Sequence, residues 1–163
     1  MKNVKIKSLT LNNYRCFSGE HEFHADFGEK TRVSGKNGSG KSTVMNAVME
    51  VLTGKNADGT QADNFRPIAD GQEVEGVDIV RTVVLDIDGK ETEIKKITKQ
   101  RRERVDGVMQ YVPGSNANSY LVDGISFTQK KFDEFIAENI CPTETLLACC
   151  NPNAFLSLKS TTD

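Results

Sequence analysis

The chain has 163 residues, 37% of them hydrophobic, which suffices for the core of one domain. Its net charge of −2 excludes a global positive field that would attract nucleic acid or membrane, so such contacts require a local patch. The sequence has no apolar run long enough to span a bilayer, no cleavable signal and no zinc spacing among its four cysteines. We expect a single cytoplasmic domain over residues 1–163 with reduced thiols and no membrane partner.

The first 34 residues predict three strands. Residues 4–11 alternate apolar and polar side chains, as a half-buried strand does, and a second strand is expected over about 21–27. A turn containing Gly28 leads into a third β-prone run, residues 30–34. This third strand runs directly into a glycine-rich loop, so two β elements precede the strand that carries the loop.

The glycine-rich loop is the strongest motif of the chain. Residues 35–42 read GKNGSGKS and match the phosphate-binding P-loop pattern GxxxxGK[ST] at every specified position. Glycines let backbone N–H groups approach phosphate oxygens without a Cβ in the way. A helix opening at Ser42 and running through residue 53 adds the partial positive charge of its N-terminus, and Gly54 is placed to cap its end. The order of strand, loop and helix predicts a nucleoside triphosphate site.

Side chains of the loop have separate predicted roles. Lys41 supplies a mobile positive charge to the β- and γ-phosphates and is the expected catalytic residue. The Ser42 hydroxyl is a hard oxygen ligand suited to Mg²⁺, and Thr43 is placed to donate to the α-phosphate. The residues predicted to bind the nucleotide through the loop are Gly35, Lys36, Asn37, Gly38, Ser39, Gly40, Lys41, Ser42 and Thr43.

Two hairpins are expected after the helix. Residues 54–76 are rich in Gly, Asp and Asn and predict an irregular connection. Residues 77–86 and 91–99 alternate on either side of an Asp-Gly turn signal, and residues 119–122 and 125–127 repeat the pattern more weakly.

Two helices complete the predicted order. Thr128 is a plausible N-cap for a helix that continues through residue 139 with its apolar residues on one stripe. A shorter helix is expected over residues 143–150, after Pro142. The whole pattern predicts an α/β P-loop NTPase fold with an additional antiparallel β subsheet.

A basic run lies at the end of the longer predicted hairpin. It places six cations in ten residues against one acid. Such a patch is able to neutralise a few phosphates of DNA without reading sequence, and a solvated strand end is the alternative. Its members are Lys95, Lys96, Lys99, Arg101, Arg102 and Arg104.

Four segments together resemble a known family. Residues 6–17, IKSLTLNNYRCF, are similar to the opening "l-x-l-x-N-F-R-x-F" of ABC-type ATPase heads in the branch of the SMC, RecF, RecN and SbcC-type proteins. The P-loop and the hairpin over residues 77–99 fit the same layout. Residues 146–156 look like the "L-x-N-P-x-Y-F" segment of phage-encoded SbcC-like ATPases. The chain therefore resembles the N-terminal half of such a head.

The resemblance implies ATP and Mg²⁺ as cofactors and a role in DNA repair, recombination or DNA end processing. Arg15 matches an arginine that lies near the nucleotide in the family, although an exposed loop arginine is an equal alternative. Asn151 falls where relatives place a residue, usually Gln, that senses Mg²⁺ and the γ-phosphate; a turn-forming Asn-Pro is the alternative. The implied partners are the C-terminal half of the same head or a second head, a nuclease subunit, and DNA.

Hydrolysis in this family requires further motifs. These are a Walker B Asp-Glu pair, a signature loop and a switch His, and the sequence contains none of them. The best substitute, residues 83–86, ends in Asp86 but continues with Ile87 where the catalytic Glu belongs. We expect a half-head without its coiled coil and C-terminal half, which binds Mg–ATP weakly and hydrolyses it negligibly. The alternatives are a complete small phosphotransferase that uses Asp86 and a non-catalytic, degenerate P-loop protein.

Overall fold

A computed structural model of the protein describes residues 2–19, 21–62 and 65–151. The strands are β1 (Val4–Asn12), β2 (Phe23–Asp26), β3 (Ile68–Ala69), β4 (Gln72–Glu73), β5 (Ile79–Ile87), β6 (Lys90–Val105), β7 (Val108–Val122) and β8 (Ile125–Phe127). The helices are α1 (Lys41–Thr53), α2 (Gln129–Asn139) and α3 (Thr143–Cys150). Residues 152–156 of the family-like closing stretch lie outside the described residues. Within the described ranges, no helix is long and apolar enough to cross a membrane.

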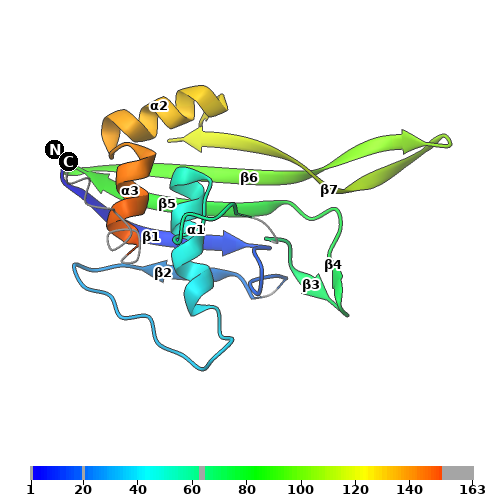
Figure 1. The fold of residues 1–163 in the computed structure, drawn as a ribbon, viewed down its shortest axis with the longest axis horizontal. Helices are drawn as coiled ribbons and strands as arrows, with labels where there is room; N and C mark the ends of the chain where they lie inside the picture. Colours follow the sequence, from blue (N-terminus) through cyan, green and yellow to red (C-terminus); the bar gives the residue numbers. More distant parts are fainter. Residues whose placement is uncertain (1, 20, 63–64, 152–163) are drawn as a thin grey trace, which may run out of the picture.

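One antiparallel sheet organises the described fold (Figure 1). Its six strands follow the order β2-β1-β5-β6-β7-β8, and a separate hairpin joins β3 to β4. Every second residue of β5, from Ile79 to Ile87, is buried, which is the period-two pattern of a half-buried strand. The buried face packs against α1 and α2 in a single core, so the P-loop helix is attached directly to the middle of the sheet.

Two-residue Asp-Gly turns connect the strands. Asp88, Asp106 and Asp123 have φ angles of 52°, 50° and 49°, and the glycine after each is also positive in φ. Positive φ at both central residues is the type I′ geometry that matches the twist of a hairpin. The two predicted hairpins are confirmed. The turn at Asp106 was not predicted. It connects β6 and β7, which have 16 and 15 residues and pair along most of their length.

Helix ends follow the sequence signals. Gly54 takes a left-handed conformation with φ 73°, and its N–H donates to the Glu50 carbonyl at 2.9 Å. Thr128 caps α2, since its hydroxyl accepts from the Lys131 N–H at 3.4 Å. The predicted helices and the α/β fold class are therefore confirmed.

The strand predicted over residues 30–34 is not formed. These residues are exposed, and Val33 keeps 48% of its surface accessible. The preceding strand, β2, is the edge of the sheet, and no described strand pairs with residues 30–34. A β-prone segment needs a neighbour for its backbone N–H and C=O groups, and the described part of the chain supplies none.

Candidate functional site

The P-loop forms a tight turn in front of α1. The Ser39 N–H donates to the Lys36 carbonyl at 3.2 Å, and the Val44 N–H donates to the Gly40 carbonyl at 3.0 Å to start the helix. Gly40 has a φ of 89°, and a Cβ built on it would lie 2.9 Å from both Cys16 Sγ and Phe17 Cζ. Only glycine fits this position, so the close contact with residues 16–17 fixes the loop against the segment that follows β1.

The partly exposed Lys41 side chain folds back across the loop. Its Nζ donates to the carbonyl oxygens of Gly35 at 2.9 Å and Lys36 at 2.7 Å. This holds a full positive charge beside the first backbone N–H groups of α1, which have no acceptor within the helix. The arrangement is a site for an anion with several oxygens, such as a polyphosphate.

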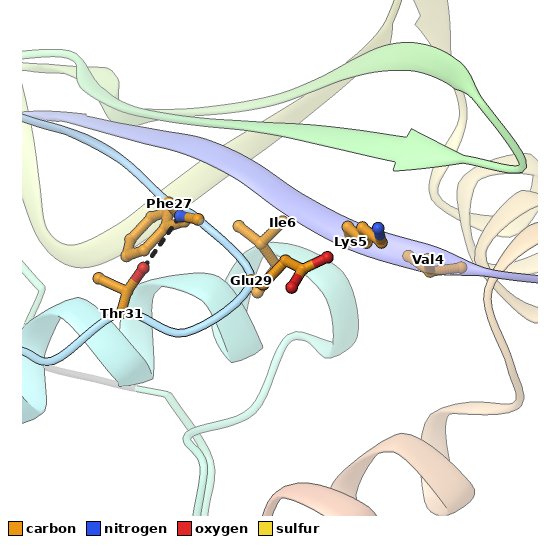
Figure 2. Close-up of a pocket in the computed structure, with 7 residues that line it drawn as sticks. Val4, Lys5, Ile6, Phe27, Glu29 and Thr31 are labelled. Atoms are coloured by element: carbon orange, nitrogen blue, oxygen red, sulfur yellow. Dashed lines mark hydrogen bonds between the residues drawn. The ribbon is translucent and has the colours of Figure 1, made fainter.

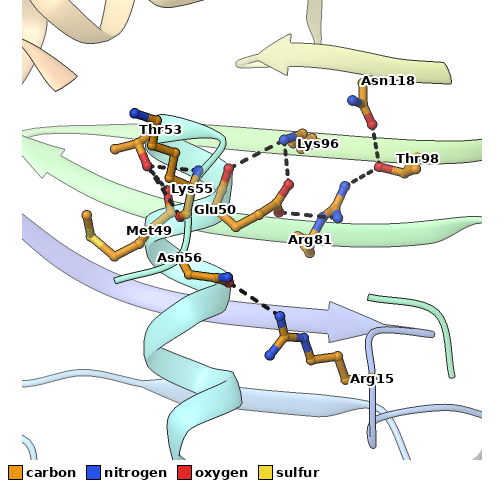
Figure 3. Close-up of polar contacts among 10 residues, drawn as sticks. All are labelled: Arg15, Met49, Glu50, Thr53, Lys55, Asn56, Arg81, Lys96, Thr98 and Asn118. Atoms are coloured by element: carbon orange, nitrogen blue, oxygen red, sulfur yellow. Dashed lines mark hydrogen bonds and ion pairs between the residues drawn. The ribbon is translucent and has the colours of Figure 1, made fainter. Parts of the chain in front are cut away.

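A cavity of about 460 Å³ opens at this point, and Arg15 contributes to it. The Arg15 backbone is left-handed, with φ 53°, and its N–H donates to the Phe65 carbonyl at 2.9 Å. Its guanidinium donates to Asn56 Oδ1 at 3.3 Å (Figure 3). Thus Arg15 and the P-loop line one cavity, and the role of Arg15 at the nucleotide stays a prediction. The lining residues are Arg15, Cys16, Asn37, Gly38, Gly40, Lys41, Ser42 and Thr43.

The two residues predicted to bind Mg²⁺ lie in different places. Ser42 lines the cavity at the start of α1. Asn151 follows α3, where its N–H donates to the Leu147 carbonyl at 3.0 Å, and it is not among the residues that line the cavity. Among the described residues no group of three or more His, Cys, Asp or Glu side chains is placed to hold a metal. The role of Asn151 therefore stays a prediction.

An apolar groove runs beside the P-loop. Two adjoining hollows of about 510 and 500 Å³ share Ile6, Phe27 and Thr31, and the second reaches Lys41 and Ser42. Figure 2 shows the first hollow, where Thr31 Oγ1 accepts from the Gly28 N–H at 3.0 Å. We call the two hollows the lateral groove. Its remaining lining residues are Val4, Lys5, Gly28, Glu29, Val33, Val44, Met45 and Val48.

The residues of the predicted basic patch do not form one exposed surface in the structure. Lys96 is only 4% exposed and lies in the core, so its assignment to a DNA-binding surface is wrong. Its place on β6 puts it on the buried face of the alternating strand. Lys95 pairs with Glu93 at 3.3 Å and Lys99 pairs with Asp78 at 3.1 Å. The other predicted members are exposed on the distal part of β6; they are Arg101, Arg102 and Arg104.

A buried charge cluster links α1 to the sheet (Figure 3). Glu50 Oε1 accepts from Lys96 Nζ at 2.5 Å, and Glu50 Oε2 lies 3.2 Å from an Nη atom of Arg81. The other Arg81 Nη atom donates to the Thr98 hydroxyl. Burial lowers the pKa of Lys96 and of Arg81, and the Glu50 carboxylate opposes both changes.

Sequence reasoning missed this cluster, although a signal was present. Arg81 and Lys96 occupy positions of β5 and β6 that the alternating pattern assigns to the core. A buried cation requires a buried anion, and Glu50 stands on the face of α1 that packs on these strands. The cluster therefore holds the P-loop helix in register with the central hairpin.

Comparisons with known proteins agree with this geometry. The family model of the AAA domain matches residues 8–152. No curated protein matches the chain significantly.

Two solved structures are similar to the chain. One, from work on ATP-driven dimerization and DNA-stimulated activation of SMC ATPases, has 19% identity and a TM-score of 0.58 over 92% of this chain and 82% of that one. The other, an SmcHead bound to the C-winged helix domain of ScpA, has 19% identity and a TM-score of 0.63. The alignment with the SmcHead structure covers 85% of this chain and 41% of that one. Together with the P-loop, these likenesses support an ATP-binding lobe.

Because the family match spans most of the chain and the solved neighbours share its architecture, the protein belongs to the AAA domain family and has the fold of the N-terminal part of an SMC ATPase head.

Proposed function

We propose that the chain is the ATP-binding lobe of an SMC-like ATPase that works on DNA in repair, recombination or end processing. The observation that carries the proposal is the P-loop cavity at the start of α1, which Lys41 and Arg15 both line. Arg15 is separated from the loop in sequence, so their common cavity supports the family-derived role of Arg15 at the nucleotide.

Mg–ATP fits the chemistry of the cavity. Backbone N–H groups and Lys41 would hold the phosphates, and Lys41 would stabilise charge on the γ-phosphate. Ser42 would hold Mg²⁺ through its hydroxyl oxygen, a ligand that this ion prefers. With Mg²⁺ held there, the site would supply positive charge that polarises the phosphate group.

The isolated lobe should not hydrolyse ATP appreciably. Of the described residues that line the cavity, none carries a carboxylate that could hold the metal or orient water. Asp86, the candidate for a self-contained phosphotransferase, accepts from the Gly89 N–H at 2.7 Å and belongs to the β5–β6 turn. These facts favour an incomplete site over the phosphotransferase alternative.

The lateral groove is where we place a second lobe. Val33 and Met45 are 48% and 47% exposed there, and residues 30–34 have a strand-forming sequence without a described neighbour. A strand from the second lobe would pair with residues 30–34 and cover these side chains. It would also lie next to Lys41 and Ser42, where a catalytic carboxylate is needed.

The partners follow the same reasoning. One similar structure concerns ATP-driven dimerization and DNA-stimulated activation, and the other holds a domain of ScpA. By analogy, we infer that ATP joins this lobe to a second head and that the assembly contacts DNA. A nuclease subunit as a further partner rests on the resemblance of the sequence to SbcC-type proteins. The four free cysteines are compatible with a cytoplasmic location.

A phosphate-release assay tests the incomplete site. The isolated chain with Mg–ATP should release phosphate no faster than a Lys41→Ala variant. Steady-state release that disappears in Lys41→Ala would show a complete enzyme and would reject the half-site proposal.

A further inference from the structure

The distal part of the β6–β7 hairpin forms a separate arm. On β6, Gln100 pairs with Asn116 and Arg102 pairs with Tyr111, so four residues of β7 have no matching place in the ladder. Pro113, which lacks a backbone N–H, lies in this interruption. Beyond it the two strands run on together, away from the helices and the rest of the sheet (Figure 1). We call residues 101–111 the distal arm.

The charge of the distal arm is opposite to that of the whole chain. It carries three arginines, Arg101, Arg102 and Arg104, against Glu103 and Asp106, whereas the whole chain has a net charge of −2. All three arginines are exposed. A local positive potential on a projecting element is suited to a polyanion.

Pairing sorts the arm into two faces. Cross-strand partners share a face and successive pairs alternate, so Arg102 and Arg104 lie with Met109 and Tyr111 on one side. The Arg102 guanidinium lies over the Tyr111 ring, 4.4 Å from its centroid, and donates to its hydroxyl. Arg104 Nε donates to the Gly107 carbonyl at 3.2 Å.

Tyr111 is itself held in place. A Cβ on Gly76 would clash with the Tyr111 side chain, so the chain before β5 packs closely on the root of the arm. The Gly76 N–H also donates to Gln100 Oε1 at 3.0 Å. Arg102 is therefore positioned before any partner binds, which reduces the entropy lost on binding.

We propose that the distal arm is a two-stranded ribbon that enters the major groove of duplex DNA, with Arg102 and Arg104 on the phosphates. The B-DNA major groove, about 12 Å wide and about 8.5 Å deep, admits a two-stranded β-ribbon. The five residues of β6 and the four of β7 in the arm extend about 17 and about 14 Å, enough to reach the floor of the groove. This inference rests on the proposed role on DNA and identifies the contact surface.

The tip of the arm favours DNA over an acidic protein. Val105 before the turn is 40% exposed, and Val108 and Met109 after it are 61% and 58% exposed. In the major groove such side chains meet the methyl groups of thymine. Duplex RNA has a deep, narrow major groove that does not admit the ribbon, so the arm should distinguish the two duplexes.

The test compares two pairs of substitutions with equal charge change. Arg102→Gln with Arg104→Gln removes two of the three cations of the arm. Lys130→Gln with Lys131→Gln removes two exposed cations from α2, away from the arm. Duplex DNA binding is measured by fluorescence anisotropy between about 50 and 200 mM salt. The arm variant should lose affinity on the order of tenfold, and its salt slope should fall by about 2. The α2 variant should bind as the parent chain does.

Several results would overturn the inference. These are no binding of duplex DNA by the parent chain, equal effects of the two pairs, equal affinity for duplex RNA, or displacement of DNA by polyglutamate at matched charge. If the arginine pair fails to fold, Val108→Glu serves instead: it leaves the stack on Tyr111 intact, and it should weaken DNA binding.

The same variants separate this inference from the ATP site. Mg–ATP binding by the arginine pair should equal that of the parent chain. Lost DNA binding with unchanged ATP binding supports the arm. If the arm variants bind DNA as the parent chain does while ATP binding still depends on Lys41, the inference about the arm is rejected. The proposed nucleotide site is then unaffected.

Discussion

Single residues of the P-loop are specified by contacts that reach outside the motif. Gly40 is needed for its left-handed backbone and also because Cys16 and Phe17 fill the space where a side chain would be. Arg15 comes from the same N-terminal segment and enters the same cavity. The loop and the segment that follows β1 therefore line one cavity.

Gly40→Ala should reduce Mg–ATP affinity at least tenfold. Left-handed φ costs a non-glycine residue about 1–2 kcal/mol, and the added methyl would also push against Cys16 and Phe17. Gly59→Ala is the matched control, since Gly59 has a φ of 83° but no atom within 4 Å of its Cβ position. Calorimetry should find that Gly59→Ala binds ATP with the affinity of the parent chain. An equal loss of ATP affinity in Gly40→Ala and Gly59→Ala would mean that the contacts with Cys16 and Phe17 are not the cause.

Glu50→Gln should destabilise the fold by about 3–5 kcal/mol, because it leaves Arg81 and Lys96 buried without their anion. Urea unfolding followed by circular dichroism measures the change. Glu91→Gln, an exposed position on β6, should change the stability by less than about 0.5 kcal/mol. Similar stabilities for the two variants would show that the cluster is not needed to hold α1 on the sheet.

At the scale of elements, α1 and α2 are defined by local signals. Gly54 ends α1 with a left-handed cap, and Thr128 begins α2 by accepting a backbone hydrogen bond. Both signals act within one helical turn, so they are visible in the sequence without knowledge of the tertiary structure.

Thr128→Ala should cost about 1 kcal/mol of stability by removing the cap of α2. Thr128→Ser keeps a hydroxyl at this position, so it should lose much less stability than Thr128→Ala. Thermal unfolding of the two variants measures the difference, and equal melting temperatures would show that the 3.4 Å hydrogen bond contributes nothing.

The sequence alone predicts the elements that local residue patterns determine. It does not predict the features that depend on residues far away in the sequence. The P-loop, α1 and the hairpin turning at Asp88 follow from their own residues. Residues 30–34 have a strand sequence, yet a strand requires a neighbour, which periodicity does not reveal. Lys96 looked like part of a surface patch because its anion, Glu50, is 46 residues away in sequence. The distal arm was missed because residues 101–111 lack the alternation that a buried face imposes.

In the described part of the molecule, helices cover one face of the sheet, and an apolar groove is exposed to solvent beside it. The helices cover one face of the sheet, whereas the lateral groove beside β1 and α1 exposes apolar side chains next to the nucleotide cavity. Exposed apolar surface of this kind marks an interaction site. This arrangement agrees with a lobe that needs a second lobe for catalysis.

Self-association of the isolated chain should involve the lateral groove. Val33→Lys combined with Met45→Lys should shift the chain toward monomer, because both substitutions place charge where a partner would bury an apolar surface. Sedimentation velocity over a range of protein concentrations measures this. Ile68→Lys, at a 70% exposed position on β3, is the control and should leave the distribution unchanged. A parent chain that stays monomeric, or equal shifts in both variants, would argue against the groove.

This lobe should bind Mg–ATP through Lys41, and titration calorimetry measures that binding. The parent chain should give a binding isotherm, and Lys41→Ala should give none. Lys130→Ala, which removes an exposed lysine of α2 that does not line the cavity, should bind like the parent chain. Equal binding by the parent chain and Lys41→Ala, or no binding by the parent chain, would contradict the account.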